Sequence, residues 1–304
     1  MRVAVVGVGY LGEHHARVFS EIEGIELSGV VDIRRERALD IASRFATQAF
    51  TDYRDVIDKV DAISIATPTS SHHEIALNVL RAGRDLFVEK PITTTVEEAD
   101  ELIEEAEKRG CILQVGHIER YNPAVTALNG LIEAPSFLES ERRSPFLGRG
   151  SDVDVTIDLM IHDIDIILKI ANSEIIDIKA EGASVITGMI DAASVWIEFD
   201  NGLIASLRAD RISRDKIRVL RVFENNSTGR RLTEVNYNKA ELRLISRDSE
   251  KTYRPEYKEP LKEELMDFVR SVITRNPPAV TGHQARRALK VALDINSIIR
   301  KGWN

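Results

Sequence analysis

Met1-Arg-Val-Ala-Val-Val-Gly7-Val-Gly9-Tyr-Leu-Gly12 opens the chain and runs directly into Glu13-His-His-Ala16. The apolar run before Gly7 is typical of a buried strand, and the residues after Gly12 have a helical pattern. Glycines in the spacing Gly-x-Gly-x-x-Gly, between a strand and a helix, permit a tight turn, close approach to a pyrophosphate and close packing of the helix on the strand. The stretch therefore predicts a dinucleotide-binding turn, with a merely structural glycine-rich turn as the alternative.

A second apolar strand, 27–31, ends in Asp32, at the position where an acidic side chain binds the ribose 2′-hydroxyl of NAD. Its carboxylate would repel the 2′-phosphate of NADP. Arg34 and Arg35 follow at once and leave NADP open as the less favoured cofactor. We therefore expect an NAD site that begins with Gly7, Gly9, Tyr10, Leu11, Gly12, Asp32 and Arg34.

Composition describes an ordinary globular protein of about two domains, with 304 residues, 43% hydrophobic residues and a net charge of −8. No basic block stands out, which argues against a nucleic-acid partner. The N-terminal apolar run is too short for a signal peptide, and no segment approaches the ~18 apolar residues of a membrane span. The single cysteine, Cys111, cannot form an internal disulfide and fits a reducing compartment. We expect a cytoplasmic protein with no membrane partner.

Strands and helices alternate up to about residue 120, which predicts an α/β Rossmann domain, a doubly wound parallel sheet, over 1–120. Expected strands are 3–7, 27–32, 62–66, 85–89 and 112–115. From 121 to 304 the pattern becomes a helix over 155–170, period-2 runs separated by polar turns, and closing helices over 260–275 and 284–300. This second part predicts an α+β domain with a large, mostly antiparallel, open-faced sheet carrying helices on one face. The helix 284–300 could also pack back on the first domain.

Polar side chains follow the carboxyl ends of the expected parallel strands, where ligands of such sheets gather. Glu89-Lys90-Pro91 ends a buried strand, so Lys90 would point into the ligand crevice, and its bond to Pro91 could be cis. A surface lysine before a helix is the alternative. Thr67 and Pro68 begin a turn that opens a helix from His72, with Ser70 or Ser71 as the expected helix cap. Thr67, Pro68, His72, Glu89 and Lys90 are expected at the nicotinamide half of the cofactor, whereas His14 and His15 are expected to pack or face solvent.

A polar stripe interrupts the apolar helix 155–170. Spacings of four and seven put Asp158, His162 and Asp165 on one face. A histidine beside a carboxylate in a crevice can accept a proton near neutral pH. A hydrogen-bonded core histidine remains an alternative, and a metal site is the least favoured reading because no His-Glu-x-x-His or cysteine cluster supports it.

Two further groups could line a substrate site. The loop 116–123 gathers hydrogen-bonding side chains at a strand end, so Arg120, Tyr121 and Asn122 are expected to bind substrate, with an interdomain linker as the alternative. Arginines also cluster in the second domain and could face a phosphate: Arg142, Arg143, Arg149, Arg208, Arg211 and Arg214.

The glycine loop, Thr67-Pro68…His72, Glu89-Lys90-Pro91 and Asp158-x-x-x-His162-x-x-Asp165 together resemble the glucose–fructose oxidoreductase, inositol dehydrogenase and rhizopine-catabolism (Gfo/Idh/MocA) oxidoreductase family. The resemblance covers nearly the whole chain. It implies a Rossmann domain followed by an open-faced α+β domain that holds the substrate and builds homodimers or homotetramers. It also implies that Lys90, Asp158 and His162 surround the reacting carbon as catalytic residues. The stretch 148–155 departs from the glycine-rich stretch of many members, so the substrate wall there must differ.

Residues 116–123 and 154–165 are similar to members that oxidise nucleotide-activated amino sugars. The resemblance implies a sugar or UDP-sugar substrate, with oxidation at C3 of UDP-N-acetylglucosamine to a 3-keto sugar. His162 would take the hydroxyl proton, and Lys90 would stabilise the alkoxide, with Lys90 as the alternative proton acceptor. An inositol or free-sugar dehydrogenase and a non-catalytic NAD-binding regulator remain the competing functions.

Overall fold

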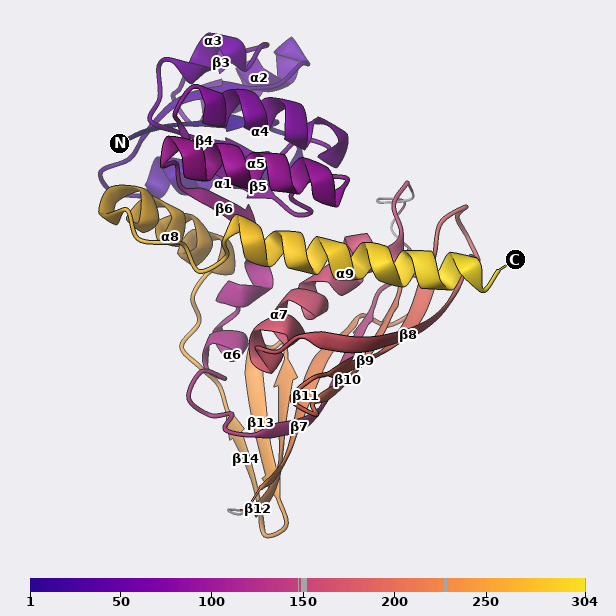
Figure 1. The fold of residues 1–304 in the computed structure, drawn as a ribbon. Helices are drawn as coiled ribbons and strands as arrows, with labels where there is room; N and C mark the ends of the chain where they lie inside the picture. Colours follow the sequence, from indigo (N-terminus) through magenta and orange to yellow (C-terminus); the bar gives the residue numbers. More distant parts are fainter. Residues whose placement is uncertain (147, 149–151, 227–228, 304) are drawn as a thin grey trace. The chain divides into compact units, whose positions relative to one another are not determined.

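The structure is a computed structural model that describes residues 1–146, 148, 152–226 and 229–303 (Figure 1). It divides into two compact units, of which the first comprises residues 1–117 and 261–286, and the second 118–260 and 287–304. The sequence pattern predicts that all of 121–304 forms the second domain. Residues 261–286 lie instead with the first unit, because Leu265, Phe268 and Val272 join its hydrophobic core.

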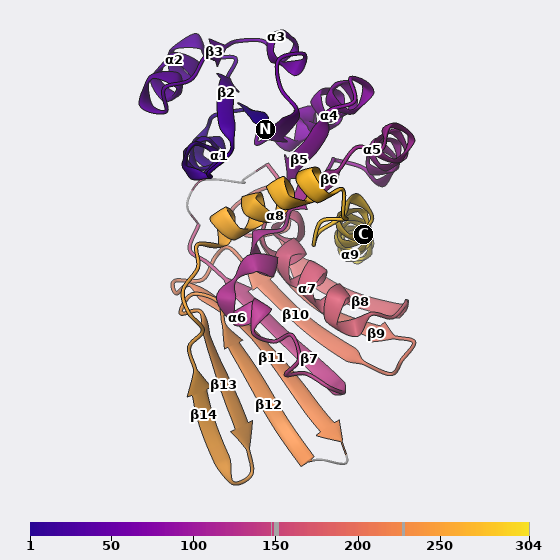
Figure 2. The ribbon, with the colours of Figure 1, turned by 90° about the vertical axis from the view of Figure 1, so that its left-hand side faces the viewer.

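The first unit is built on a parallel sheet in the order β3-β2-β1-β4-β5-β6. Its strands are β1 (Arg2–Val6), β2 (Glu26–Val31), β3 (Ala49–Phe50), β4 (Ala62–Ile65), β5 (Asp85–Glu89) and β6 (Leu113–Gly116). Its helices are α1 (Tyr10–Glu21), α2 (Arg35–Arg44), α3 (Arg54–Ile57), α4 (His72–Arg81), α5 (Val96–Arg109) and α8 (Pro260–Thr274). Helices α1 and α2 cover one face, and α4 and α5 cover the other (Figure 2).

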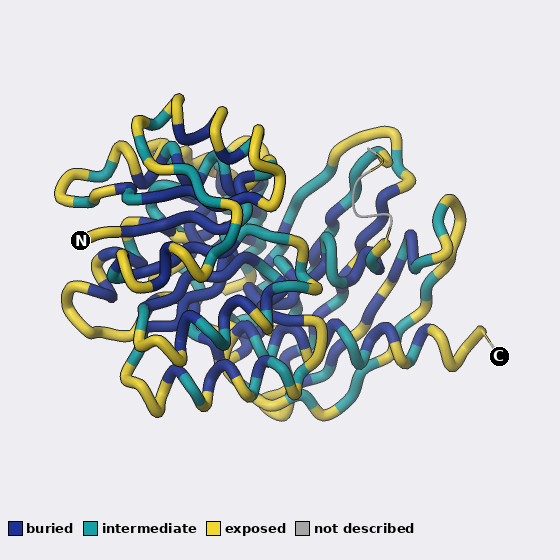
Figure 3. The backbone as a smooth tube through the Cα atoms, turned by 90° about the horizontal axis from the view of Figure 1, so that it is seen from above, coloured by how far each residue is buried: buried dark blue, intermediate teal, exposed yellow. Residues whose placement is uncertain are grey.

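Both faces of this sheet are buried, so most residues of its strands are apolar on both faces rather than alternating. Every residue of β4 and β5 is buried, and Figure 3 shows the strands beside the N-terminus as mostly buried. Phe19 of α1, Phe87 of β5 and Phe268 of α8 belong to one core cluster. This packing holds the carboxyl ends of the strands, and the loops that follow them, in a fixed frame.

The second unit is built on a larger sheet in the order β14-β13-β12-β11-β7-β10-β9-β8, in which only the β7–β10 pair is parallel within the described residues. Its strands are β7 (Pro135–Arg143), β8 (Ile175–Ala183), β9 (Ala192–Phe199), β10 (Ile204–Asp210), β11 (Ile217–Asn226), β12 (Gly229–Asn236), β13 (Glu241–Ser246) and β14 (Ser249–Tyr253). Its helical segments are α6 (Pro123–Thr126), α7 (Ile161–Ala171) and most of α9 (Gly282–Lys301). The predicted fold class is confirmed for both units.

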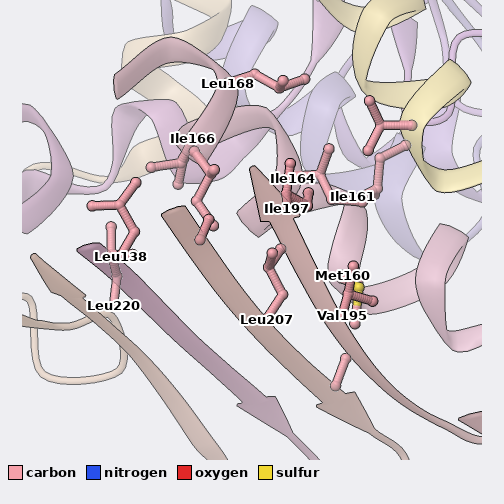
Figure 4. Close-up of a cluster of buried hydrophobic side chains, with 14 of the residues drawn as sticks. Leu138, Met160, Ile161, Ile164, Ile166, Leu168, Val195, Ile197, Leu207 and Leu220 are labelled. Atoms are coloured by element: carbon pink, nitrogen blue, oxygen red, sulfur yellow. The ribbon is translucent and has the colours of Figure 1, made fainter. Parts of the chain in front are cut away.

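The core of the second unit lies between α7 and one face of this sheet. Figure 4 shows Ile161 and Ile164 of α7 near Ile197 of β9, and Met160 beside Val195, together with other residues of the cluster. Ile295 and Ile299 of α9 belong to the same cluster. The opposite face carries the alternate residues of each strand, most of which are half-buried or exposed.

Three short or polar strands have no counterpart among the predicted elements. In β7 the inward positions beyond Leu138 are Ser140 and Arg142, both buried, so the apolar alternation that marks a strand is missing. All of β14 is exposed at the edge of the sheet, and β3 has only two residues. No helix in the described ranges combines the length and apolar character that a membrane crossing needs.

Candidate active site

The glycine loop joins β1 to α1 with the geometry that the sequence predicts. Gly7 has φ +83°, and a Cβ there would lie 2.6 Å from Thr67 Cγ2. A Cβ on Gly12 would lie 1.8 Å from the carbonyl oxygen of Gly7, so the helix could not pack this closely on the strand with any other residue. By contrast, a Cβ on Gly9 would meet nothing within 4 Å. The loop is thus tight on its protein side and open on its outer side, where Tyr10 and Leu11 are also exposed.

The N-terminus of α1 suits a phosphate group. Gly9 is its N-cap and supplies no side-chain cap, so the first backbone N–H groups of this 12-residue helix remain available to a ligand. These N–H groups and the open side of Gly9 together fit a dinucleotide pyrophosphate. NAD therefore fits the residues present.

Asp32 follows β2 and is buried, and its Oδ1 accepts a hydrogen bond of 2.9 Å from the backbone N–H of Arg34. The Arg34 guanidinium, 68% exposed, lies 3.4 Å from the same oxygen. Arg37 of α2 was not predicted as a site residue. Its guanidinium donates to the carbonyl oxygens of Val8 and Gly9 at 2.7 and 3.2 Å and therefore braces the loop. Sequence spacing cannot reveal this contact, because it depends on how α2 returns along the sheet.

His72 joins the two turns expected near the nicotinamide. Its ring nitrogens each lie 2.9 Å from a backbone carbonyl oxygen, one of Thr67 and the other of Pro91. Burial lowers the pKa of His72 even though the two carbonyl contacts oppose the effect, so the neutral ring is favoured and donates to one of the two carbonyl oxygens. Ser71, one of the two predicted caps, occupies the N-cap position of α4, but its hydroxyl contacts the Thr67 hydroxyl and the Pro68 carbonyl and makes no cap hydrogen bond to the helix. The His72 ring thus links the turn at Thr67 to the turn at Pro91 on the buried side of both.

Lys90 directly follows β5, is half-buried, and forms the cis peptide bond to Pro91 that the sequence admitted. The Glu89 carboxylate faces the protein interior. Its Oε1 lies 3.0 Å from Nε2 of His15, and its Oε2 accepts a 3.2 Å hydrogen bond from the backbone N–H of Lys90. The expectation that His15 packs or faces solvent misses its polar role, because its Nδ1 also lies 2.8 Å from the Ser64 hydroxyl. No local pattern connects α1, β4 and β5 in the sequence.

The second unit carries the polar helix segment. The predicted helix begins as a π-helical turn (Thr156–Met160) and continues as α7. Asp158 lies on the π turn and His162 in the first turn of α7, and both are half-buried. The spacing of four between them is therefore not that of a regular α-helix, contrary to the sequence analysis. Single π turns occur frequently at functional sites.

Asp165, the third member of the predicted stripe, lies in a buried ion pair instead. Arg120 donates to both of its carboxylate oxygens, at 2.7 Å to Oδ1 and also to Oδ2, and both side chains are at most 3% exposed. The Arg120 guanidinium thus serves to anchor α7. Asn122 is similarly engaged, because its side chain accepts from the backbone N–H of Ala124 and caps α6. Tyr121 is buried beside them.

A second buried ion network lies on the other side of α7. Arg142 of β7 is 1% exposed and donates to Asp163 at 2.6 and 3.1 Å and to Glu119 at 2.8 Å. Burial opposes its charge, but Asp163 and Glu119 outweigh that penalty and raise the pKa of Arg142. Burial likewise opposes ionisation of Glu119, yet Arg142 lowers its pKa. The network fixes the helix that carries His162.

Buried ion pairs remove Arg142 and Arg211 from the phosphate-binding role considered above for the arginine cluster. Arg142 is engaged as described, and Arg211 is buried against Asp191 at 2.9 Å. Arg208 is exposed and lines a depression on the open face of the sheet. Arg149 lies outside the described residues. Within the described residues, no group of three or more His, Cys, Asp or Glu is arranged to hold a metal ion.

Comparisons with known proteins give consistent results for both units. Residues 1–117 match GFO_IDH_MocA, described as an oxidoreductase family with an NAD-binding Rossmann fold, and residues 135–226 match the GFO/IDH/MocA C-terminal domain. The chain is 35% identical to UDP-N-acetylglucosamine 3-dehydrogenase of Acidithiobacillus ferrooxidans, over 97% of this chain and 96% of that one. The solved structure of that enzyme superimposes with a TM-score of 0.94 and covers 99% of this chain and 98% of its own. The chain is also 27% identical to myo-inositol 2-dehydrogenase of Thermotoga maritima, over 95% and 93% of the two chains.

Proposed function

This chain belongs to the GFO/IDH/MocA family of NAD-binding oxidoreductases, and from that premise we propose that it oxidises C3 of UDP-N-acetylglucosamine to the 3-keto sugar. The observation that carries the proposal is its end-to-end similarity to an enzyme named for that reaction. Lys90 and His162, the residues with the chemistry that the reaction needs, add support.

NAD⁺, when bound, supplies the acceptor for the hydride of the carbinol carbon. We assign its pyrophosphate to the backbone of Gly9–Gly12 and its adenosine ribose to Asp32. The turns at Thr67-Pro68 and at Glu89-Lys90 are assigned to the nicotinamide half, with His72 as their brace. The open outer side of Gly9 supports the first of these assignments.

His162 takes the proton of the substrate hydroxyl in this proposal, because a neutral imidazole is a suitable base near pH 7. Lys90 donates a hydrogen bond to the same oxygen and stabilises the negative charge that develops on it. Asp158 orients the hydroxyl or the imidazole. Lys90 is the alternative base. We also assign Arg120, Tyr121 and Asn122 to the wall of the substrate site. Arg120 and Asn122 contribute indirectly, because Arg120 anchors α7 through Asp165 and Asn122 caps α6.

A panel of substrates tests the function. Purified protein and NAD⁺ are incubated with UDP-N-acetylglucosamine, other UDP-sugars and free polyols, and NADH absorbance is followed. We expect turnover with UDP-N-acetylglucosamine and little or none with the polyols. Turnover confined to a free polyol would refute the proposed substrate while leaving the reaction class intact.

An inositol dehydrogenase is the second candidate. The similarity to the Thermotoga maritima myo-inositol 2-dehydrogenase, which also spans nearly the whole chain, favours it over other free-sugar enzymes. Its lower identity makes it the weaker candidate. The same substrate panel separates the two, because inositol carries no nucleotide.

The cofactor preference is tested by replacing Asp32. In Asp32→Ala we expect the ratio of NAD affinity to NADP affinity to fall about tenfold or more, since a lost charge-assisted hydrogen bond is worth ~1.5–3 kcal/mol. The positive side chain of Arg34 would then face a 2′-phosphate without a competing carboxylate. Asp58→Ala, which removes an exposed acid of the same unit, is the control and should leave the ratio unchanged. Equal ratios in Asp32→Ala and the wild type would exclude Asp32 from ribose recognition.

We also propose that the chain forms homodimers or homotetramers through the open face of its larger sheet. Phe137 stacks there against Trp196 and Phe223, with ring centroids 5.8 and 5.5 Å apart. A row of alternating charges crosses five strands of the same face, comprising Glu139, Arg221, Glu234, Arg243 and Glu250. Such a row is self-complementary, because a second copy shifted by one position places arginine opposite glutamate.

Light scattering tests this assembly. Trp196→Asp should convert the oligomer into a monomer, because it buries a charge in the proposed interface. Tyr257→Asp changes another exposed aromatic residue of the second unit and should leave the mass unchanged. A wild-type protein that is monomeric at micromolar concentration would rule the interface out.

A cytoplasmic location also remains a proposal. Its support is the single cysteine, Cys111, which is half-buried and has no intramolecular cysteine to pair with. Burial, aided by the charge of Asp85, raises the pKa of this thiol and keeps it unreactive.

A further inference from the structure

A buried chain of polar side chains lies behind Lys90 and has no part in the chemistry proposed above. Ser64 of β4 and His15 of α1 are both inaccessible to solvent. The His15 ring lies between the Ser64 hydroxyl, at 2.8 Å, and the Glu89 carboxylate, at 3.0 Å. Three separate elements of the first unit therefore converge on one carboxylate, and a buried polar network of this kind has to be satisfied as a whole.

The surroundings of Glu89 are shaped to hold that carboxylate in one place. A Cβ on Gly116 would lie 2.9 Å from both Cδ and Oε2 of Glu89, so only glycine leaves room for it. On the other side the backbone N–H of Lys90 donates to Oε2 at 3.2 Å. The Glu89 carboxylate thus accepts a hydrogen bond from the backbone of Lys90, the residue that the proposed reaction uses.

Three titratable side chains from three segments of the first unit interact with the Glu89 carboxylate. His15 contacts it from α1, Lys90 follows it in the chain, and His72 of α4 experiences its charge. Burial by itself would raise the pKa of Glu89. The hydrogen bond from His15 and the charges of His15 and Lys90 outweigh burial and lower that pKa. Because an ionised carboxylate only accepts hydrogen bonds, Nε2 of His15 must be the donor.

We propose that His15 and Ser64 are positioning residues that keep the Glu89 carboxylate ionised and fixed, and that Glu89 in turn orients Lys90 and faces it with a negative charge. Ser64 selects the ring orientation of His15, and His15 supplies the hydrogen bond that stabilises the charge on Glu89. Neither residue touches substrate or cofactor. This inference rests on the proposed role of Lys90.

The first test is a titration that needs neither cofactor nor substrate. The ¹³Cδ signal of Glu89, assigned with Glu89→Gln, is followed against pH in the full-length protein without NAD. In His15→Phe the hydrogen bond is lost and burial remains, so the midpoint should move to higher pH by about one unit or more. His15→Gln retains an N–H donor of similar reach and should stay near the wild-type midpoint. An unchanged midpoint in His15→Phe would overturn the proposal.

The second test is the pH profile of turnover. In His15→Phe, kcat should fall relative to the wild type only at pH values below the raised Glu89 midpoint found in the first test, by about tenfold per pH unit, and the limb produced by the base should keep its position. Ser64→Ala should give a smaller fall in the same direction. His283→Phe removes a surface histidine that pairs with Glu107 at 2.8 Å and should leave the profile unchanged. A uniform loss of kcat at every pH would indicate a merely structural role and contradict the inference.

The two tests separate this inference from the proposed function. A shifted Glu89 titration in a protein that turns over no sugar would refute the proposed function alone. Normal turnover of UDP-N-acetylglucosamine with an unshifted titration would refute the positioning role alone. If His15→Phe does not fold, His15→Gln and Ser64→Ala still decide the question. A wild-type pH profile of kcat in Ser64→Ala, together with a shifted profile in His15→Gln, would contradict the proposal that Ser64 acts on Glu89 through His15.

Discussion

Lys90→Ala and His162→Ala should each lower kcat by about 10²-fold or more, the lower range for loss of a general acid–base group, while NAD affinity stays within about threefold of the wild type. The reason is that both side chains are assigned to the substrate hydroxyl, one as base and the other as the group that stabilises the alkoxide. Steady-state kinetics with UDP-N-acetylglucosamine, combined with NAD titration by fluorescence, measures the two quantities separately.

Surface residues of the same types provide matched controls. Lys108 is an exposed lysine paired with Glu105, and His283 is an exposed histidine paired with Glu107. Alanine at either position should leave kcat unchanged. The pH profile then identifies the base, because removal of the base abolishes the acidic limb, whereas removal of the other group lowers the whole curve. Near-normal turnover in Lys90→Ala or in His162→Ala would remove that residue from the reaction.

Arg142→Met should lower the free energy of unfolding of the second unit by about 3–5 kcal/mol, the cost of leaving buried charges without their partner. The substitution leaves Asp163 and Glu119 buried beneath α7 without the guanidinium that contacts both. Urea denaturation followed by tryptophan fluorescence measures this loss, because Trp196 and Trp303 both lie in the second unit. Arg243→Met is the control. Arg243 also contacts two glutamates but is 39% exposed, so its loss should cost less than about 1 kcal/mol.

The stability lost in Arg142→Met should depend on pH, because the Arg142 guanidinium lowers the pKa of Glu119. In the wild type the pKa of Glu119 is lowered, so its contribution to stability is present above its unfolded pKa and is lost as pH falls through the folded value. In Arg142→Met only Arg218 and Asn122 still oppose burial, so the pKa of Glu119 is lowered less and Glu119 contributes less stability at neutral pH. The difference between the two proteins should therefore be larger at pH 7 than at pH 4.5. A difference that is independent of pH would contradict this account of the network.

The first βαβ unit could be predicted from the sequence because its determinants are local. Gly7 has the positive φ of a tight turn, Gly12 is required by its contact with the carbonyl of Gly7 in the same loop, and Asp32 follows from the fixed length of the unit. Lys90 could be proposed for the same reason, since it follows a strand that is buried throughout. Where the geometry depends on a single segment of the chain, the spacing of residues in the sequence is sufficient to predict it.

The contacts that hold the site depend on pairs of distant residues, and here the sequence pattern was insufficient. Strand β7 was not predicted, because Arg142 occupies one of its inward positions and breaks the apolar alternation. An arginine in a sequence suggests a surface residue unless its buried partner, here Asp163, is known. Asp165 was assigned to the polar stripe, although Arg120 engages it from another segment. His15 looked like a packing residue, yet its partners Ser64 and Glu89 lie 49 and 74 positions away in the chain. Each error concerns a polar side chain whose partner comes from elsewhere in the fold.

Isotope transfer tests the central claim most directly. The protein is incubated with NAD⁺ and UDP-N-acetylglucosamine that carries deuterium at C3, and the reduced cofactor is analysed by mass spectrometry. The account predicts reduced NAD that carries one deuterium, together with a sugar product that has lost it as a 3-keto group forms. Reduced NAD without deuterium would show that the hydride comes from another carbon, and a cofactor that stays oxidised would show that this sugar is not the substrate.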